Sequence, residues 1–354
     1  MKLAVAISPT RSLLPLMAWV LLLLPALLHA AAFEPDIRPG PGVTVQRLMS
    51  DYFAPLKGTN MDTDVFILDS GKPGATALIF GGTHGNELAG TVAGLVLVEN
   101  VTVSAGKLIV IPYANGSAIS VPDTRNGIAQ RHRIVTRSGE RYLPYGDRRT
   151  DPDDQGRDDP EHYRNPPGYV LENGKESRNL NRTWPGSENG TPTEQLSHAI
   201  MALIRQESVD FNLDMHEAGT SDWEASLDDD YRPGRNWRLA YTLVAHPRGL
   251  EIAAMALLDL EMNTGISMKL EESNPDYRGL SHLEIGSATP SLSFLSESPN
   301  PGQDRGREDA DVISDPKYPL AHRVGLHLGV VEALAGAYAL ESNKPLAIEG
   351  LPAY

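Results

Sequence analysis

The stretch GGTHGNE, residues 81–87, directly follows the apolar run ATALIF, residues 75–80, and these two segments determine the predicted fold. A short, mostly apolar run bounded by glycines is typical of a buried strand. His84 and Glu87 lie just beyond its end. In an open parallel sheet, ligands bind outside the carboxyl ends of the strands. We therefore predict a functional site where this strand ends.

Similar short apolar runs recur along the chain and alternate with helical patterns. The best helix signal begins at Thr191, where Pro192 and Glu194 complete a capping box, and two further amphipathic segments cover residues 249–263 and 320–340. The other candidate strands are KLIVIPY (107–113), VDFNLDM (209–215), YTLVAH (241–246) and PSLSFLS (290–296). This alternation predicts an α/β fold with a mainly parallel, mixed central sheet flanked by helices.

The first 32 residues have the pattern of a secretory signal peptide. Lys2 and Arg11 precede the apolar stretch LLPLMAWVLLLLPALL, and the run Ala30-Ala31-Ala32 offers a small-residue cleavage site. The alternative is a single retained membrane anchor, which would be short and is interrupted by Pro15 and Pro25. We expect an exported protein, periplasmic or extracellular, with one catalytic domain at residues 33–354 and no stable membrane insertion after cleavage.

The amino-acid composition limits the possible binding partners and the possible metal ligands. The formal net charge of −15 argues against nucleic acid as a partner, because phosphate binding needs clustered lysine and arginine. The chain has no cysteine, which excludes disulfides, thiolate metal sites and cysteine nucleophiles. Any bound metal must therefore be held by histidine and carboxylate groups.

Three residues form a candidate metal set. His84 and Glu87 are three apart at the start of a helical turn, so their side chains can point the same way. His216 follows the predicted strand in VDFNLDMHEA and so lies just past another strand end. Two histidines and one carboxylate, with one open position for water, are typical of catalytic zinc. Asp214, two residues before His216, could fix the tautomer of that imidazole.

Four short blocks then resemble one protein family. In chain order, GGTHGNE, NLNRTWPG (179–186), LDMHEA (213–218) and PSLSFLSES (290–298) are similar to the succinylglutamate desuccinylase/aspartoacylase family, a branch of the zinc metallocarboxypeptidase superfamily. The resemblance implies a single zinc-carboxypeptidase-like domain with one Zn²⁺ per chain, bound by His84, Glu87 and His216. It also implies that Asn181 and Arg182 bind substrate, that Arg182 assists catalysis and that Glu297 is the general base.

The sequence also departs from the family pattern. The usual Asp-Leu-Asn-Arg is here Asn179-Leu180-Asn181-Arg182, which leaves the role of the first position open. The family's second substrate arginine could be Arg125, Arg141, Arg164 or Arg178, and we favour Arg178 or Arg164. Tyr277 stands roughly where carboxypeptidases have a mobile, substrate-binding tyrosine.

Two regions differ in organisation from the rest. Residues of about 117–190 are polar with almost no apolar periodicity, which predicts an inserted loop region that is either a lid or site rim, or a solvated insertion without a role. The 57 residues after Glu297 are mainly one predicted helix, so the β-rich capping domain of many relatives is not expected.

The predicted function is an exported zinc-dependent amide hydrolase that cleaves an amide bond next to a free carboxylate. Its substrate would be a small acyl amino acid or a short peptide. One alternative is a metallocarboxypeptidase acting on peptides such as those of the cell wall. Another is a non-catalytic zinc-containing binding protein, against which the presence of a general base, Glu297, argues.

Overall fold

A computed structural model of the chain describes residues 35–121, 130–136, 139–220, 239–304 and 311–352. The predicted signal peptide and Arg125 lie outside these ranges. The described residues all belong to one compact unit, residues 33–354.

The fold is built on one mixed sheet. Its strands are β1 Val45–Leu48, β2 Asp64–Asp69, β3 Thr76–Gly81, β5 Lys107–Ile111, β10 Phe211–Ala218, β11 Thr242–Ala245, β12 Lys269–Glu272 and β13 Leu292–Pro299. Within the described ranges, these eight strands have the spatial order β1-β2-β5-β3-β10-β13-β11-β12. The central strands β5, β3, β10 and β13 are mutually parallel, whereas β2 and β11 are antiparallel to their inner neighbours. The predicted mainly parallel, mixed sheet is confirmed.

All five predicted strands lie in this sheet, and three further strands flank them. β1 and β12 are exposed or half-buried edge strands, which lack a continuous apolar run and so give little sequence signal. Residues 65–68 of β2 are an apolar run of the same kind as the others and could have been predicted.

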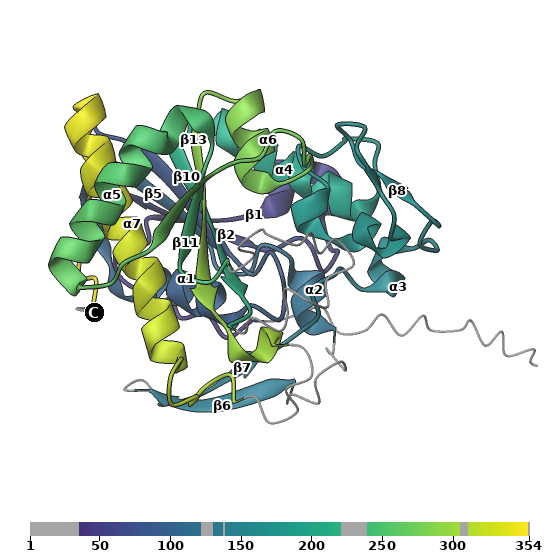
Figure 1. Cartoon of the computed structure of the whole chain (residues 1–354), viewed down its shortest axis with the longest axis horizontal. Helices are drawn as coiled ribbons and strands as arrows, with labels where there is room; N and C mark the ends of the chain where they lie inside the picture. Colours follow the sequence, from purple (N-terminus) through teal and green to yellow (C-terminus); the bar gives the residue numbers. More distant parts are fainter. Residues whose placement is uncertain (1–34, 122–129, 137–138, 221–238, 305–310, 353–354) are drawn as a thin grey trace, which may run out of the picture. The chain divides into compact units, whose positions relative to one another are not determined.

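Helices cover both faces of the sheet. They are α1 Leu88–Asn100, α2 Gly116–Ser120, α3 Pro152–Gln155, α4 Pro192–Gln206, α5 Leu250–Thr264, α6 Ser281–Ala288 and α7 Leu320–Ser342. α1, α5 and α7 pack on one face, and α4 and α6 on the other (Figure 1). The predicted capping box of α4 is present, because the Thr191 hydroxyl accepts from Glu194 N and the Glu194 carboxylate accepts from Thr191 N.

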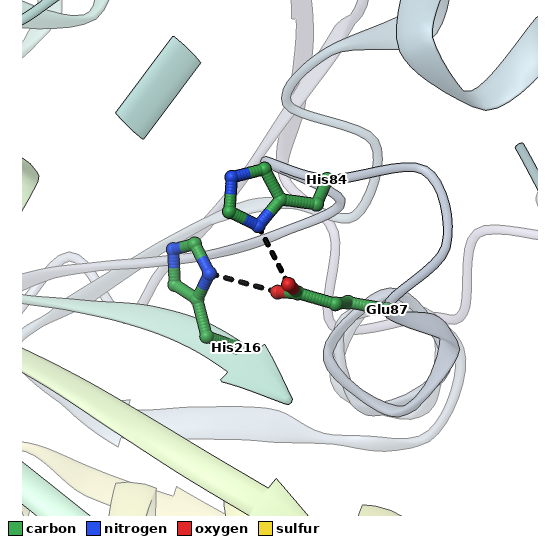
Figure 2. Close-up of side chains that lie close together, drawn as sticks. All are labelled: His84, Glu87 and His216. Carbon is green, nitrogen blue, oxygen red and sulfur yellow. Dashed lines mark hydrogen bonds and ion pairs between the residues drawn. The ribbon is translucent and has the colours of Figure 1, made fainter. Parts of the chain in front are cut away.

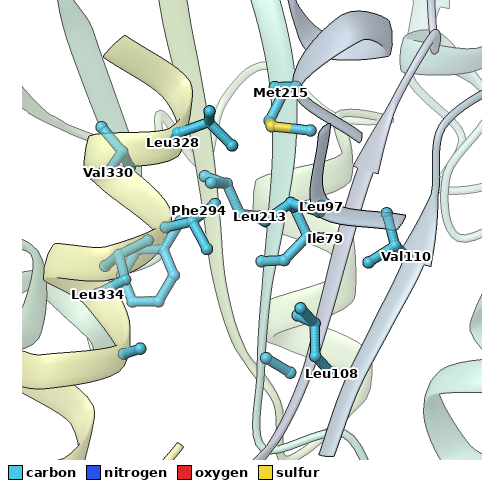
Figure 3. Packing of buried hydrophobic residues seen from close by; sticks show 14 of the residues in the cluster. Ile79, Leu97, Leu108, Val110, Leu213, Met215, Phe294, Leu328, Val330 and Leu334 are labelled. Carbon is cyan, nitrogen blue, oxygen red and sulfur yellow. The ribbon is translucent and has the colours of Figure 1, made fainter. Parts of the chain in front are cut away.

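Two apolar cores hold these layers together. On the α1, α5 and α7 face, Ile79, Leu213 and Phe294 of the central strands meet Leu334 of α7 and Leu97 of α1 (Figure 3). Facing α4, the side chains of alternate strand residues pack against the apolar face predicted for that helix. α7 is long and apolar enough to cross a membrane by length and composition, but it is mostly buried against the sheet and its neighbours, as a core helix is.

The sequence predicted a loop region at residues 117–190. The described parts of this region instead contain short strands and helices. They contain the pair β6 Arg131–Thr136 and β7 Gly139–Pro144, the pair β8 Tyr163–Arg164 and β9 Val170–Leu171, and the 3₁₀ helices η3 Gly174–Arg178 and η4 Leu180–Arg182. These elements are only two to six residues long, so no periodicity develops, yet the region contains the buried residues Tyr145, Leu180 and Trp184. The remaining short elements are β4 Thr102–Ala105 paired with β14 Ala347–Glu349, and the 3₁₀ helices η1 Met49–Asp51, η2 Ala54–Leu56, η6 Pro247–Gly249 and η7 Pro301–Gln303.

Two glycines set the distance between α1 and the sheet. A Cβ added to Gly81 would lie 2.3 Å from the carbonyl carbon of Gly90, and one added to Gly90 would lie 2.3 Å from Met215 O. Only hydrogen fits at these positions, so α1 lies directly on β3 and β10. This approach brings the N-terminus of α1, with Glu87, to the ends of both strands.

Candidate metal centre and active site

His84, Glu87 and His216 come together at the carboxyl ends of the central strands (Figure 2). His84 lies three residues past β3, Glu87 is the N-cap residue of α1, and all three side chains are buried. His84 Nδ1 is 2.6 Å from Glu87 Oε1, and His216 Nδ1 is 2.8 Å from Glu87 Oε2. Their potential ligand atoms all lie within 4.8 Å of one another, which is close enough to share one metal ion.

His216 lies inside β10 rather than past its end, which corrects the sequence prediction. β10 continues to Ala218 because it pairs in parallel with β13, and His216 is directly beside Glu297 in that pairing. Adjacent residues of paired strands project from the same face of a sheet. The candidate ligand and the candidate base are therefore neighbours on one face.

The outer nitrogen of each imidazole lies close to an oxygen atom, and that of His84 is hydrogen-bonded to it. His84 Nε2 is 2.9 Å from Asn179 Oδ1, and His216 Nε2 is 2.8 Å from Asp214 Oδ2. Because Asn179 Nδ2 donates to Glu176, its oxygen faces His84, so with a metal bound His84 would donate from Nε2 and offer the Nδ1 lone pair to the ion. Metal-binding histidines are oriented in this way by an acceptor on the second nitrogen. The open role of Asn179 is thus to orient His84, whereas Asp214 lies at ion-pair distance from His216 Nε2 without accepting a hydrogen bond from it.

The charges at the triad fit a bound cation. Burial opposes a charge on His216, but Asp214 and Glu87 outweigh it and raise the pKa of that imidazole well above its usual value. Burial would raise the pKa of Glu87, yet His84 and His216 hold it well below its usual value. Burial lowers the pKa of His84 to about 4. In the metal-free site, His216 therefore carries an extra proton beside the ionised Glu87. A divalent ion could replace that proton and bind the donor atoms of the triad.

Glu297 supplies a buried carboxylate beside this cluster. Among the described residues, none hydrogen-bonds to its Oε2, although the side chain is almost fully enclosed. Burial raises the pKa of Glu297 to about 8; the charge of Glu87 adds to the shift, while His216 and Arg148 oppose it. An unpartnered carboxylate oxygen in this position can accept a proton.

The predicted substrate residues fall into two groups. Asn181, Arg182 and Tyr277 lie together, since the Arg182 guanidinium is 5.3 Å from the centre of the Tyr277 ring, and Asn181 Oδ1 accepts from the backbone of α6 at 2.8 Å. Arg178 is elsewhere. Its Nε and Nη2 donate to both carboxylate oxygens of Asp159 at 2.8 and 2.9 Å, and Nη1 donates to a backbone carbonyl at 2.7 Å.

Neither arginine favoured from the sequence reaches the triad, so their role in substrate binding stays a prediction. Arg178 is fully engaged in the fold, Arg164 is exposed and donates to a neighbouring carbonyl, and Arg141 pairs with Glu99. Among the described arginines, Arg148 reaches the triad, because its Nη1 lies 3.2 Å from Glu87 Oε1.

A backbone contact between distant segments places Arg148 there. Gly85 N donates to Asp147 O at 2.7 Å, and Gly146 N donates to Gly85 O at 2.8 Å, so the segment before Arg148 pairs with the GGTHGNE loop. Nothing in the sequence distinguishes Arg148 from the other arginines of its region except the tandem Arg148-Arg149.

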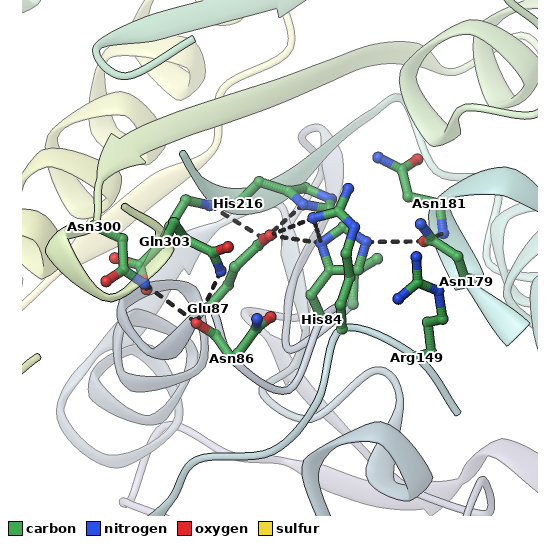
Figure 4. Close-up of polar contacts among 12 residues, drawn as sticks. His84, Asn86, Glu87, Arg149, Asn179, Asn181, His216, Asn300 and Gln303 are labelled. Atoms are coloured by element: carbon green, nitrogen blue, oxygen red, sulfur yellow. Dashed lines mark hydrogen bonds and ion pairs between the residues drawn. The ribbon is translucent and has the colours of Figure 1, made fainter. Parts of the chain in front are cut away.

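Arg148, Arg149 and Arg182 surround one carboxylate, that of Glu176. Burial alone would raise the pKa of Glu176, but these three guanidinium groups lower it to about 2, so it is ionised. Arg149 binds Glu176, and Figure 4 shows Arg149, Asn179 and Asn181 beside the triad. Arg148 also contacts Glu87, so three guanidinium groups face two carboxylates, and the remaining positive charge can attract an anion.

Comparisons with known proteins add the following. The chain matches no family model and no curated protein sequence. Solved structures do match. They include a succinylglutamate desuccinylase from Silicibacter sp. TM1040, at 20% identity over 77% of this chain and 60% of that one, with a TM-score of 0.41. A succinylglutamatedesuccinylase/aspartoacylase from Rhodobacter sphaeroides matches at 16% identity over 77% and 59%, with a TM-score of 0.42.

A third match is the mDAP-bound form of Csd4, a D,L-carboxypeptidase from Helicobacter pylori, at 15% identity over 77% of this chain and 52% of that one, with a TM-score of 0.42. The family that the sequence resembles is thus among the matching structures. This chain spans between about half and three fifths of the length of these proteins. At identities of 15–20% and TM-scores of 0.41–0.42, only the side chains of this chain can indicate its chemistry.

Proposed function

We propose that this protein is a zinc-dependent hydrolase that cleaves an amide bond next to a free carboxylate in an acyl amino acid or a short peptide. One observation carries the proposal: the Nδ1 atoms of His84 and His216 converge on the Glu87 carboxylate, beside the unpartnered carboxylate oxygen of Glu297. Two histidines and one glutamate are a protein ligand set of catalytic zinc.

Zinc bound by these three residues would polarise a carbonyl group and lower the pKa of water from about 15.7 towards about 7. Glu297 takes a proton from the attacking water and passes it to the departing amine. Its raised pKa would leave it protonated at neutral pH, but a cation at the neighbouring triad favours the ionised form that a base requires. Arg148, which contacts Glu87, would stabilise negative charge on the attacked carbonyl oxygen.

The substrate carboxylate would bind at Arg182 and Asn181. A guanidinium fork can form two parallel hydrogen bonds to a carboxylate. The Tyr277 ring against Arg182 restricts the orientation of that fork. The excess of positive charge around Glu176 favours an anionic substrate. Both a deacylase and a carboxypeptidase need such a carboxylate site, so the assay panel has to contain both substrate types.

The test combines metal analysis with kinetics. Wild type, His84→Ala, Glu297→Ala and Arg182→Ala are analysed for zinc and assayed on N-acyl amino acids and short peptides, with Arg164→Ala as an exposed-arginine control. We expect near-stoichiometric zinc that is lost in His84→Ala and kept, without activity, in Glu297→Ala. Arg182→Ala should raise KM for substrates with a free carboxylate but not for their amides. Zinc without hydrolysis of any substrate would favour the binding-protein alternative, and absence of zinc after supply would refute the proposal.

Export is part of the same proposal and rests on the sequence of residues 1–32. N-terminal sequencing of the protein recovered from the periplasm or medium of an expressing cell tests it. We expect a mature terminus after Ala32; an intact N-terminus in the membrane fraction would support the retained anchor instead.

A further inference from the structure

A buried carboxylate that the proposed chemistry does not use lies directly behind the metal centre. Glu217 follows His216 in β10, so its side chain projects from the opposite face of the sheet. It is fully buried, and four groups donate to it. Arg323 Nη1 at 2.6 Å and Ser298 Oγ at 3.2 Å contact Oε1, while Ala89 N at 2.9 Å and Asn300 Nδ2 at 3.1 Å contact Oε2.

These contacts connect β10 to the start of α1. Ala89 is the second residue of α1, and the helix begins just after its N-cap residue, Glu87. The first backbone N–H groups of a helix have no partner within the helix, and a carboxylate there also interacts favourably with the helix dipole. The Glu87 side chain does not cap α1, so the Glu217 carboxylate takes that role.

The turn that carries Glu87 is held from two more directions. Asn300 Nδ2 and Gln303 Nε2 each donate to Asn86 O at 3.2 Å, as Figure 4 shows. The backbone N–H of Glu217 also donates to Glu87 Oε2 at 3.2 Å. The carboxylate of Glu87 is thus positioned both directly and through the helix that follows it.

Arg323 of α7 neutralises the charge of the buried Glu217 carboxylate. Its side chain is fully buried in α7, and besides Glu217 it binds Val312 O through Nη2. Burial raises the pKa of Glu217, and the charge of Arg323 opposes that shift. A buried ion pair is a weak source of net stability, because desolvation offsets the attraction, so a role in positioning accounts for it better.

We propose that Glu217, paired with Arg323, is a positioning residue for the metal centre that holds the N-terminus of α1 so that Glu87 faces His84 and His216. The inference rests on the proposed function only in that the triad binds metal. Outer partners of metal ligands typically change metal affinity by about 10- to 100-fold when they are removed. We expect a loss of zinc affinity of this size.

The test measures zinc affinity rather than turnover. Glu217→Gln keeps the shape and one acceptor but loses the charge that pairs with Arg323. A matched control is Glu99→Gln, because Glu99 lies near the other end of the same helix and pairs with Arg141 at 2.7 Å. The dissociation constant for zinc is determined by chelator competition for metal-free wild type and both variants, and the Tm of each metal-free protein is recorded.

We expect the zinc dissociation constant to rise at least 10-fold in Glu217→Gln and to stay within 2-fold in Glu99→Gln. If Glu217→Gln does not fold, Arg323→Lys, which keeps the charge, is expected to show a smaller rise in the same constant. The inference would be overturned if a folded Glu217→Gln bound zinc within 2-fold of wild type. If Glu217→Gln does not fold, the same result for Arg323→Lys would overturn it. An equal loss of zinc affinity in Glu99→Gln would also overturn it. Wild type that binds zinc but hydrolyses nothing would refute the proposed function alone, whereas wild type without zinc affinity would refute both.

Discussion

In the metal-free protein, Glu297 should make the free energy of unfolding fall as the pH rises, and Glu297→Gln should remove that dependence. Burial raises the pKa of this carboxyl from 4.5 to about 8 in the folded chain. Between these values the native state keeps a proton that the unfolded chain has released. The stabilisation is therefore fully present below the unfolded pKa and is lost as the pH rises through the folded one.

The size of the effect follows from the shift. One pKa unit corresponds to about 1.4 kcal/mol, so the free energy of unfolding should fall by at most about 1.4 kcal/mol per pH unit through this group. Over the whole window, from pH 4.5 to about 8, the upper bound is on the order of 5 kcal/mol. His216 and Glu87 titrate in both proteins, so the difference between wild type and Glu297→Gln reports Glu297 together with its coupling to these two neighbours.

The assay is urea unfolding of EDTA-treated protein, followed by circular dichroism, at pH 5, 6, 7 and 8. Glu251→Gln, an exposed position on α5, is the matched control and should follow the wild-type profile. We expect the wild-type free energy of unfolding to decline relative to Glu297→Gln across this range, and saturating zinc to reduce the decline. Parallel profiles for wild type and Glu297→Gln would show that the carboxyl is already ionised at pH 5, and the reasoning from its burial would fail.

Other consequences of the structure can be tested with single substitutions. Arg148→Met should lower kcat and leave the zinc content unchanged. Arg178→Met should leave the steady-state kinetics unchanged. It should lower the free energy of unfolding by about 1–3 kcal/mol, because the hydrogen bonds of Arg178 to Asp159 are lost. A lower kcat or a higher KM in Arg178→Met, with unchanged kinetics in Arg148→Met, would support Arg178 as the second substrate arginine. Asn179→Ala should weaken zinc binding by about 10-fold in chelator competition, since His84 loses the acceptor at Nε2, and unchanged affinity would contradict that role. Gly90→Ala should lower the free energy of unfolding by at least about 1–3 kcal/mol, because its Cβ would meet backbone at 2.3 Å; wild-type stability in urea would argue against this close packing.

Much of the fold and part of the site could be predicted from local patterns. The strand runs beginning at Ala75 and Lys107 lie in the sheet because continuous apolar runs suit strands that are covered on both faces. The capping box at Thr191 fixed the start of α4 because its two hydrogen bonds involve residues only three apart. His84 and Glu87 are similarly close in sequence, so their mutual contact was accessible to sequence reasoning.

What the sequence could not determine depends on contacts between distant segments. Arg148 reaches Glu87 because its segment pairs with the loop around Gly85, and Arg178 does not, because it is paired with Asp159. The position of His216 inside its strand depends on how far β10 pairs with β13.

The sequence by itself determined which elements form and which residue types could hold a metal, because periodicity, capping and ligand chemistry act within a few residues. The tertiary structure alone decided that Asn179 orients His84 and that Glu217 and Arg323 support the start of α1. These pairings are 95, 128 and 106 residues apart in the chain, and only the packing of helices on the sheet brings such groups within hydrogen-bonding distance.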